Sequence, residues 1–466
     1  MSISGGKRQR RVNLYVLSTL SFLISLGFGL IAPFLPFYAE FLGADAIAIG
    51  VLLSSFMITR ALLATPFGNL SDAIGRKKIV GVGSVMYALL AFLFTLPEDW
   101  VGLIFVRAFQ GVASAMVWPV GEALLVDSVP EKQRGQAMGT YIFAANLGWV
   151  LGPLIGGALL FLGQNVLGLD TLSSFRFPFY VLAILSLVAA GLFFATVEDI
   201  IEPRKHRKRR GRATNGERKK TILDMRTRFE LRILYLNGLV NGFSMGILSF
   251  ITVLFMNDIL HIEEYAIGII IGLTGSIGII ANIPAGRQAD KVGRKPVLLL
   301  GGYLARFAAL VLPFAGFLPL RELGRATSYA FPFVYGLVAI SALLGVRFFA
   351  FQISQPAMRA LQADLIPKPV RGRLIGLMQT TFNIGAIIGA PVGGALYMAF
   401  RGDVLGFSPF TFPGEGFPFI ISAILGFITL TLILLYVREP RKARKVRLSQ
   451  KQYKTGNHIH GGANGL

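Results

Sequence analysis

Long apolar blocks dominate the chain, and short polar or charged segments separate them. Examples are Val12–Tyr38, Ile47–Leu70, Ile79–Leu96 and Phe179–Ala195. The apolar residues run continuously instead of forming one stripe per helix, so each helix must face apolar surroundings on all sides. A bilayer span needs about 20 such residues at about 1.5 Å of rise each. The pattern predicts an all-α integral membrane protein with twelve transmembrane helices, six before residue 198 and six after residue 229.

One pattern of glycines and charges, G-x-x-x-D-x-x-G-R-K, occurs at 68–77 and again at 286–295. Each copy follows one apolar block and precedes another. Further matches keep the same order in both halves: Ile49-Gly50 with Ile267-Gly268, Asp127 with Asp364, Asn146 with Asn383, and Gly156-Gly157 with Gly393-Gly394. This internal duplication predicts two pseudo-symmetric six-helix bundles, the usual framework of a solute pathway that opens to alternate sides.

The repeat and the apolar blocks together predict five segments. These are a basic N-terminus at 1–11, a first bundle at 12–197, a basic linker at 198–229, a second bundle at 230–437 and a basic tail at 438–466. The least certain span boundary lies between Thr327 and Asp364, because that stretch exceeds the length of one span. The first apolar block lacks a small-residue cleavage site, so we expect no cleavable signal sequence.

The net charge of +22 is concentrated in the N-terminus, the linker and the tail, whereas the opposite loops carry acids such as Glu40, Asp45 and Glu98. This is the positive-inside pattern. It predicts a multi-pass protein of the cell membrane with both termini in the cytoplasm. We expect the basic segments to bind anionic lipid head groups, and we expect no nucleic-acid partner.

Several classes of site are not indicated. The chain has no cysteine, and its four histidines do not cluster within the apolar blocks, so we expect no metal site. No Walker loop and no H-E-x-x-H pair occurs. The sequence therefore predicts neither an enzyme nor a pump driven directly by ATP.

The motifs together resemble the major facilitator superfamily over nearly the whole chain. The repeated loop pattern is similar to the family's motif between helices 2 and 3, and Arg107-Ala-Phe-Gln-Gly111 is similar to its R-x-x-Q-G segment. The segment 148–157, with Gly148, Gly152, Pro153, Gly156 and Gly157, resembles an element of proton-coupled drug exporters. The resemblance implies export of small lipophilic compounds by proton antiport through alternating access. The proton gradient would supply the energy without a cofactor, and we expect a monomer.

The repeated loops predict a conformational latch. We expect Gly68 to allow close helix approach, Gly75 to make the turn, and Asp72 and Arg76 to cluster with Asp127. A matching set in the second half is Asp290, Arg294 and Asp364. The resemblance implies that this cluster holds the halves together when the pathway faces outward. The alternative is that Arg76 and Lys77 only anchor the helix at the membrane surface.

The glycines of the fifth span predict close packing. Gly148, Gly152 and Gly156 fall at i, i+4 and i+8, on one helix face, and Pro153 removes a backbone hydrogen bond and bends the helix. These residues with Gly157 form a candidate hinge. Packing and bending alone would also explain them.

Charges within the spans are costly and normally face water or a partner. Arg107 and Glu122 are the candidates for proton coupling. The alternative for Arg107 is a structural bond to backbone carbonyls of the first helix, and Glu122 lies close to the structural cluster around Asp127. The cavity candidates are Arg60, Asn146, Arg347 and Asn383, whereas we interpret Arg306 as a member of a structural pair.

The interior contains more arginine than acid, which favours anionic, zwitterionic or neutral substrates over organic cations. Two further functions therefore stay open. One is uptake or facilitated transport of an anionic metabolite or lipid. The other is a membrane sensor that reuses the transporter scaffold through its basic linker.

Overall fold

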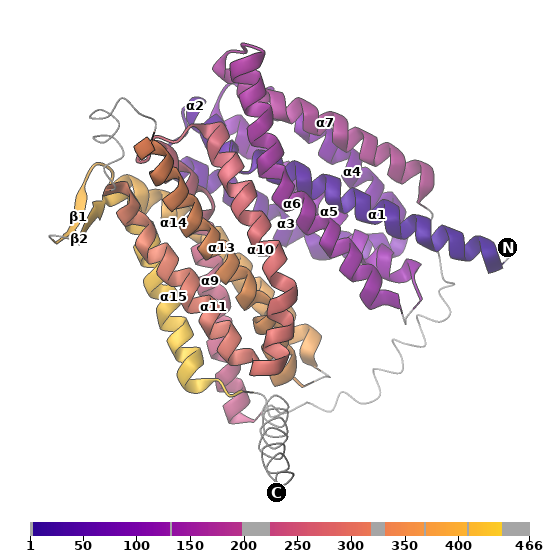
Figure 1. Ribbon diagram of the computed structural model, residues 1–466. Helices are drawn as coiled ribbons and strands as arrows, with labels where there is room; N and C mark the ends of the chain where they lie inside the picture. The colour runs from indigo at the N-terminus through magenta and orange to yellow at the C-terminus, as the bar shows by residue number, and fades with distance from the viewer. Residues whose placement is uncertain are drawn as a thin grey trace, which may run out of the picture. The chain divides into compact units, whose positions relative to one another are not determined.

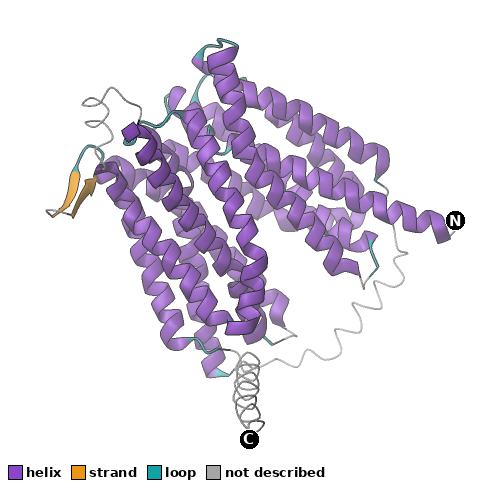
Figure 2. Cartoon of the chain, in the orientation of Figure 1, coloured by secondary structure: helices purple, strands orange, loops and turns teal. Residues whose placement is uncertain are grey.

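The computed structural model describes residues 3–130, 133–197, 224–317, 331–367, 370–407 and 410–439. Within these ranges the protein is almost entirely helical, and one short hairpin is present (Figures 1 and 2). Most of the predicted linker, at 198–223, and most of the tail, at 440–466, lie outside the described residues.

Six long helices form the first half. They are α1 (Ile3–Ile31), α3 (Ala46–Ile74), α4 (Arg76–Leu93), α5 (Trp100–Ser128), α6 (Arg134–Phe161) and α7 (Thr171–Thr196). Two short elements join them, α2 (Leu35–Phe41) and a π-helical turn, η2 (Leu162–Val166).

Six long helices also form the second half. They are α9 (Met225–Asp258), α10 (Glu264–Val292), α11 (Arg294–Val311), α13 (Phe331–Leu365), α14 (Arg371–Ala399) and α15 (Phe417–Tyr436). The short elements are η3 (Leu312–Phe317), the antiparallel strands β1 (Val404–Phe407) and β2 (Phe410–Pro413), and η5 (Gly414–Gly416). One 35-residue helix, α13, thus occupies most of the stretch between Thr327 and Asp364, where the predicted span boundary was open.

Ten helical segments of the described chain are long and apolar enough to cross a membrane. The two long helices without such a segment are α4, which begins with Arg76-Lys77-Lys78, and α10, whose apolar part Glu264–Gly278 is shorter. The prediction of an all-α membrane protein is confirmed. The twelve long helices of the described ranges agree with the predicted number of spans.

Aspartate side chains of the loops cap the N-termini of three of these helices. Asp45 accepts a hydrogen bond from the backbone N–H of Ala48 at 2.7 Å, and Asp99 accepts one from Gly102 at 2.8 Å. Asp170 caps α7 in the same way through Ser173, whose hydrogen bonds lower the pKa of that carboxyl. These caps satisfy backbone donors that have no partner within the helix. These three aspartates therefore stabilise the starts of the helices that follow them.

The chain divides into two compact units. The first comprises Met1–Lys220, Gly242–Leu273 and Asn383–Pro418, and the second comprises Thr221–Asn241, Thr274–Phe382 and Phe419–Leu466. The division cuts α9, α10 and α14, because parts of these helices pack with the first six. The two bundles with a boundary at the linker stay a prediction.

Glycines set the helix spacing in the first unit. A Cβ added at Gly148, Gly152 or Gly156 of α6 would lie 2.2 to 2.6 Å from the carbonyl oxygens of Phe22, Leu26 and Leu30 in α1. Gly111 of α5 has the same relation to α3, since an added Cβ would lie 2.4 Å from the Phe56 carbonyl oxygen. These backbones approach closely because the side chains are absent.

We expect Gly152→Ala to lower the stability of the protein by about 1–3 kcal/mol, because every nearest atom around the new methyl group belongs to the α1 backbone and cannot rotate away. Thermal unfolding of the purified protein in detergent would measure the change. Gly191→Ala on α7 is the matched control, since an added Cβ there meets nothing within 4 Å. Equal melting temperatures for the two variants would contradict this account of the α1–α6 contact.

Candidate functional site

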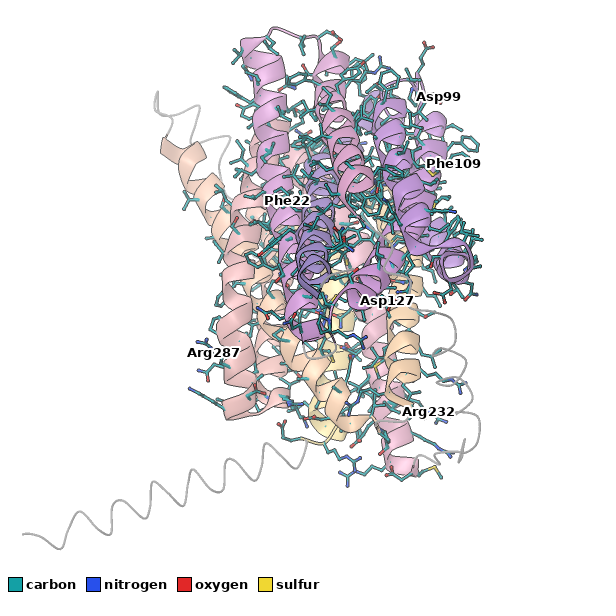
Figure 3. All side chains as sticks on the ribbon, turned by 90° about the vertical axis from the view of Figure 1, so that its right-hand side faces the viewer. Phe22, Asp99, Phe109, Asp127, Arg232 and Arg287 are labelled. Atoms are coloured by element: carbon teal, nitrogen blue, oxygen red, sulfur yellow. The ribbon has the colours of Figure 1, made fainter. Side chains whose placement is uncertain are left out.

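The first copy of the loop motif forms an ion-pair cluster at one end of the first bundle, which we call the motif end. Arg76 pairs with Asp127 of α5, lies 3.3 Å from Asp72 of α3 and donates to the carbonyl of Ala123. Its side chain is 17% exposed, whereas that of Asp127 is 51% exposed. Asp127 and Asp99 lie at opposite ends of α5 (Figure 3). The predicted set of Asp72, Arg76 and Asp127 therefore comes together from three helices.

The second copy repeats this geometry within the second unit, at an end of that unit which we also call its motif end. Arg294 pairs with Asp364 of α13, lies 3.7 Å from Asp290 and donates to the carbonyl of Ala360 at 2.7 Å. Arg232 and Arg287 lie toward the same end of this unit (Figure 3). The same arrangement of aspartate, arginine and aspartate thus recurs in both halves.

Glu439 is a member of the second cluster that the sequence did not indicate. Its two carboxylate oxygens accept the backbone N–H groups of Arg294 and Lys295, each at 2.9 Å. An anion at the start of α11 is stabilised by the free N–H groups and the helix dipole. The available signal was an acid within an otherwise basic segment after the last span.

Two glycines of the first loop differ in use. Gly75 has φ = +104°, so it makes the turn between α3 and α4 as expected. A Cβ added at Gly68 would meet nothing within 4 Å, so the close helix approach that we expected there is wrong for this conformation. Lys77 donates to the Phe194 carbonyl of α7 at 3.2 Å, which ties α4 to a neighbouring helix.

The opposite end of the first unit, which we call the far end, joins helices from both halves of the sequence through glycines. A Cβ added at Gly157 of α6 would lie 2.6 Å from the Tyr265 carbonyl oxygen of α10, and one at Gly394 of α14 would lie 2.1 Å from the Ala46 carbonyl oxygen of α3. Since Gly157 and Gly394 are matched positions of the repeat, the two contacts form a pseudo-symmetric pair. Ser54 of α3 also donates to the Ile387 carbonyl of α14 at 2.7 Å.

Arg107 is buried among aromatic rings instead of facing a carboxylate. Its guanidinium carbon lies 4.6 Å from the ring centre of Phe28 and 4.9 Å from that of Phe56, and Nη1 donates to Gln110. The side chain is 2% exposed, and its Nε has no hydrogen-bond partner among the described residues. The ring of Trp149 stacks on Phe28 at 5.1 Å. We had considered hydrogen bonds from Arg107 to backbone carbonyls of α1. The structure instead shows Arg107 stacked on the ring of Phe28, a side chain of α1.

Glu122 is exposed, and the basic side chain that acts on it electrostatically is Arg60, which is also exposed. The charge of Arg60 also acts on the hydroxyls of Tyr87 on α4 and Tyr141 on α6. These four residues come from α3, α4, α5 and α6, so the opposite charges of Glu122 and Arg60 attract each other within the first bundle. Asn146 is also exposed, and Asn383 is half-buried.

Arg306 and Arg347 are both half-buried in the second unit. Arg306 donates to Asn241 of α9, and its Nη1 lies 3.4 Å from Ser422 Oγ of α15. Arg347 lies over the ring of Phe348, 5.7 Å from its centre. The structural pairing that we expected for Arg306 therefore involves neutral partners.

The far end also contains a cavity of about 260 Å³ that the sequence did not indicate. Its charged lining residues are Glu40, Asp45, Asp258 and Arg401. Asp258 accepts a hydrogen bond from the Tyr397 hydroxyl at 2.7 Å and lies 3.7 Å from Arg401. Desolvation raises the pKa of Glu40, and the negative charges of Asp258 and Glu264 add to this effect while Arg401 opposes it.

Comparison with known proteins gives one consistent result for the family. The family model of the Major Facilitator Superfamily matches residues 17–346 and 234–459. The chain is 27% identical over 426 residues to an uncharacterized MFS-type transporter of Methanocaldococcus jannaschii, covering 90% of this chain and 97% of that protein. It is 31% identical over 192 residues to the quinolone resistance protein NorA of Staphylococcus aureus, covering 41% of this chain and 46% of NorA.

Solved structures show the same fold at low sequence identity. A bacterial homologue of the human lysosomal transporter Spinster has a TM-score of 0.68 at 15% identity, covering 96% of this chain and 99% of that chain. The nucleoside transporter NupG has a TM-score of 0.66 at 15% identity, covering 91% and 100%.

We expect Glu40→Gln to flatten the pH dependence of stability. A carboxyl whose pKa in the folded protein lies above its ordinary value of 4.5 favours the folded state when protonated, and that contribution is lost as pH rises through the raised pKa. The melting temperature of the unmodified protein should therefore fall more than that of Glu40→Gln between about pH 4.5 and about pH 7. Glu98→Gln, an exposed acid outside the cavity, is the control and should follow the unmodified protein. Parallel curves for all three proteins would contradict the prediction.

Proposed function

The chain belongs to the Major Facilitator Superfamily, and we propose that it exports small lipophilic compounds by proton antiport. Its relatives are transporters, not enzymes, as the sequence predicted. The observation that carries the antiport proposal is the exposed carboxyl of Glu122 within the span α5, which the charge of Arg60 attracts. The partial similarity to NorA supports drug-like substrates.

Glu122 is the proposed proton carrier. Deprotonated, it is stabilised by the charge of Arg60, and protonation removes that attraction. A proton and a substrate that compete for one binding-competent state are coupled reciprocally, so binding of one favours release of the other. Arg107, enclosed by aromatic rings one turn above Gly111, has the supporting role of holding α1, α3 and α5 in register.

Alternating access in this proposal uses the two ends of the protein. The far-end glycine contacts close one side and must separate when the pathway opens there. The clusters around Arg76 and Arg294 act as the latch at the motif end. Both ion-pair clusters are built from side chains at helix ends, where small movements break ion pairs without disturbing the bundle core.

The proposal places the protein in the cell membrane as a monomer, with the motif end and both termini in the cytoplasm. The basic segments there would contact anionic lipid head groups. Transport of an anionic compound is the second candidate function. It is favoured because arginines outnumber acids within the described spans.

Glu122→Gln should abolish proton coupling while leaving downhill movement of the substrate. In proteoliposomes, a panel of lipophilic dyes should drive proton flux through the unmodified protein, and the variant should reduce this flux at least about tenfold. Glu122→Asp should retain part of it, and Glu98→Gln should retain all of it. Coupled flux that survives in Glu122→Gln would assign proton transfer to another residue.

Gly394→Leu should hold the far end open, because its Cβ would lie 2.1 Å from a backbone oxygen of α3. The chain contains no cysteine, so Ser54→Cys provides a unique reporter at a position that is 4% exposed in this structure. A membrane-impermeant maleimide should label that cysteine at least about tenfold faster when Gly394→Leu is also present.

Gly376→Leu is the matched control for this labelling experiment. It changes a glycine of the same helix where an added Cβ meets nothing within 4 Å, so it should leave the cysteine protected. Slow labelling in the Gly394→Leu background would show that the far end is not held closed by this contact.

A further inference from the structure

Two arginines of the second unit lie within electrostatic range of each other. Arg306 is on α11 and Arg347 is on α13, and these two helices pack side by side. Both side chains are half-buried within helices that are long and apolar enough to span a membrane. Two like charges in such a setting repel each other and are costly unless an anion or water faces them.

The described hydrogen-bond partners of Arg306 are neutral. Its guanidinium donates to the Asn241 amide oxygen and lies near the Ser422 hydroxyl, at 3.4 Å between Nη1 and Oγ. Gly426 leaves room for it, since a Cβ there would lie 2.2 Å from Nε. The guanidinium is therefore positioned by three helices, α9, α11 and α15, while its charge is left uncompensated by them.

The described acids of this unit lie elsewhere and have their own partners. Asp290 and Asp364 pair with Arg294, Glu230 pairs with Arg438, Glu439 accepts two backbone N–H groups, and Asp224 accepts the N–H of Thr227. Arg306 follows Arg294 by twelve residues, or about 18 Å along α11. Arg347 precedes Asp364 by seventeen residues, or about 25 Å along α13. These acids are thus too distant to neutralise the arginine pair.

A buried polar atom lies on α9 one turn from Asn241, the hydrogen-bond partner of Arg306. Asn237 is 2% exposed, its Oδ1 has no hydrogen-bond partner among the described residues, and it precedes Asn241 by one helical turn. Buried amides without partners are costly, and a ligand that brings a hydroxyl or N–H group would satisfy this one.

We propose that Arg306 and Arg347 bind the acidic group, a carboxylate or a phosphate, of the compound that the protein transports. An arginine fork donates two parallel hydrogen bonds to either group, and one anion between two guanidinium groups removes their repulsion. The inference rests on the proposed transport function and narrows its substrate to lipophilic anions and zwitterions.

The first unit supports this division of roles. There the opposite charges of Glu122 and Arg60 attract each other, so Arg60 has an acid to offset its charge without a ligand. The duplicated scaffold therefore carries a proton-binding acid in one half and an anion-binding pair in the other.

Three probes of one shape test the proposal on the purified full-length protein. They are 2-naphthoate, 2-naphthyl phosphate and the neutral 2-naphthamide, and binding is measured by titration calorimetry and by thermal shift. At least one of the two anions should bind at least about tenfold tighter than the amide, and the better anion identifies the acidic group.

Arg347→Gln should remove this preference by weakening anion binding more than amide binding, whereas Arg347→Lys should keep part of it. Arg373→Gln, which removes an exposed arginine at the motif end of α14, is the matched control and should keep the full preference. Melting temperatures without ligand verify that each variant is folded. Arg306→Gln is the second test and should give the same loss.

Equal binding of the anions and the amide to the unmodified protein would overturn the proposal, as would a preference that persists in Arg347→Gln. The outcome is independent of proton coupling. Anion preference with no dye-driven proton flux would reject antiport and keep the arginine site, whereas coupled flux without anion preference would reject only the arginine site.

Discussion

Direct backbone contact at glycines is the constraint on which the rest of the structure depends. In a lipid environment apolar side chains gain little by leaving their surroundings, so helices associate where small residues allow dense packing. Gly152 does this between α6 and α1, and Gly111 does it between α5 and α3. Each contact fixes a helix pair at a distance that no other residue type permits.

Close helix spacing also determines which partners the charged side chains contact. Arg76 and Arg294 lie at helix ends, where a carboxylate from another helix and free backbone carbonyls are within reach. Arg107 has no such partner because the α1–α3–α5 packing around it supplies aromatic rings. Stacking on a ring face stabilises a guanidinium without neutralising it. The same packing thus produces neutral ion pairs at the motif end and an unneutralised cation within the bundle.

Periodicity predicted the elements of this fold well and their neighbours poorly. The apolar blocks gave the helices, the duplicated loop gave the partners of Arg76, and the spacing of Gly148, Gly152 and Gly156 gave the packed face of α6. Spacing shows which residues share a face, but the helix that this face meets depends on contacts between residues far apart in the chain. For this reason the contact of Gly157 with α10, the cap from Glu439 and the rings around Arg107 were not predicted.

The duplicated scaffold repeats its loop clusters and glycine contacts in both halves, whereas the charged residues within the spans differ between the halves. Glycine contacts recur at matched positions, Gly157 and Gly394, because both halves must close with the same helix geometry. The proposed antiport, in which two ligands move in opposite directions, needs two different binding chemistries within that shared frame. Glu122 with the opposite charge of Arg60 in one half, and Arg306 with the like charge of Arg347 in the other, provide such a difference. Since the loop motif is nearly identical in both halves, the residues that distinguish the halves are the better guide to what is transported.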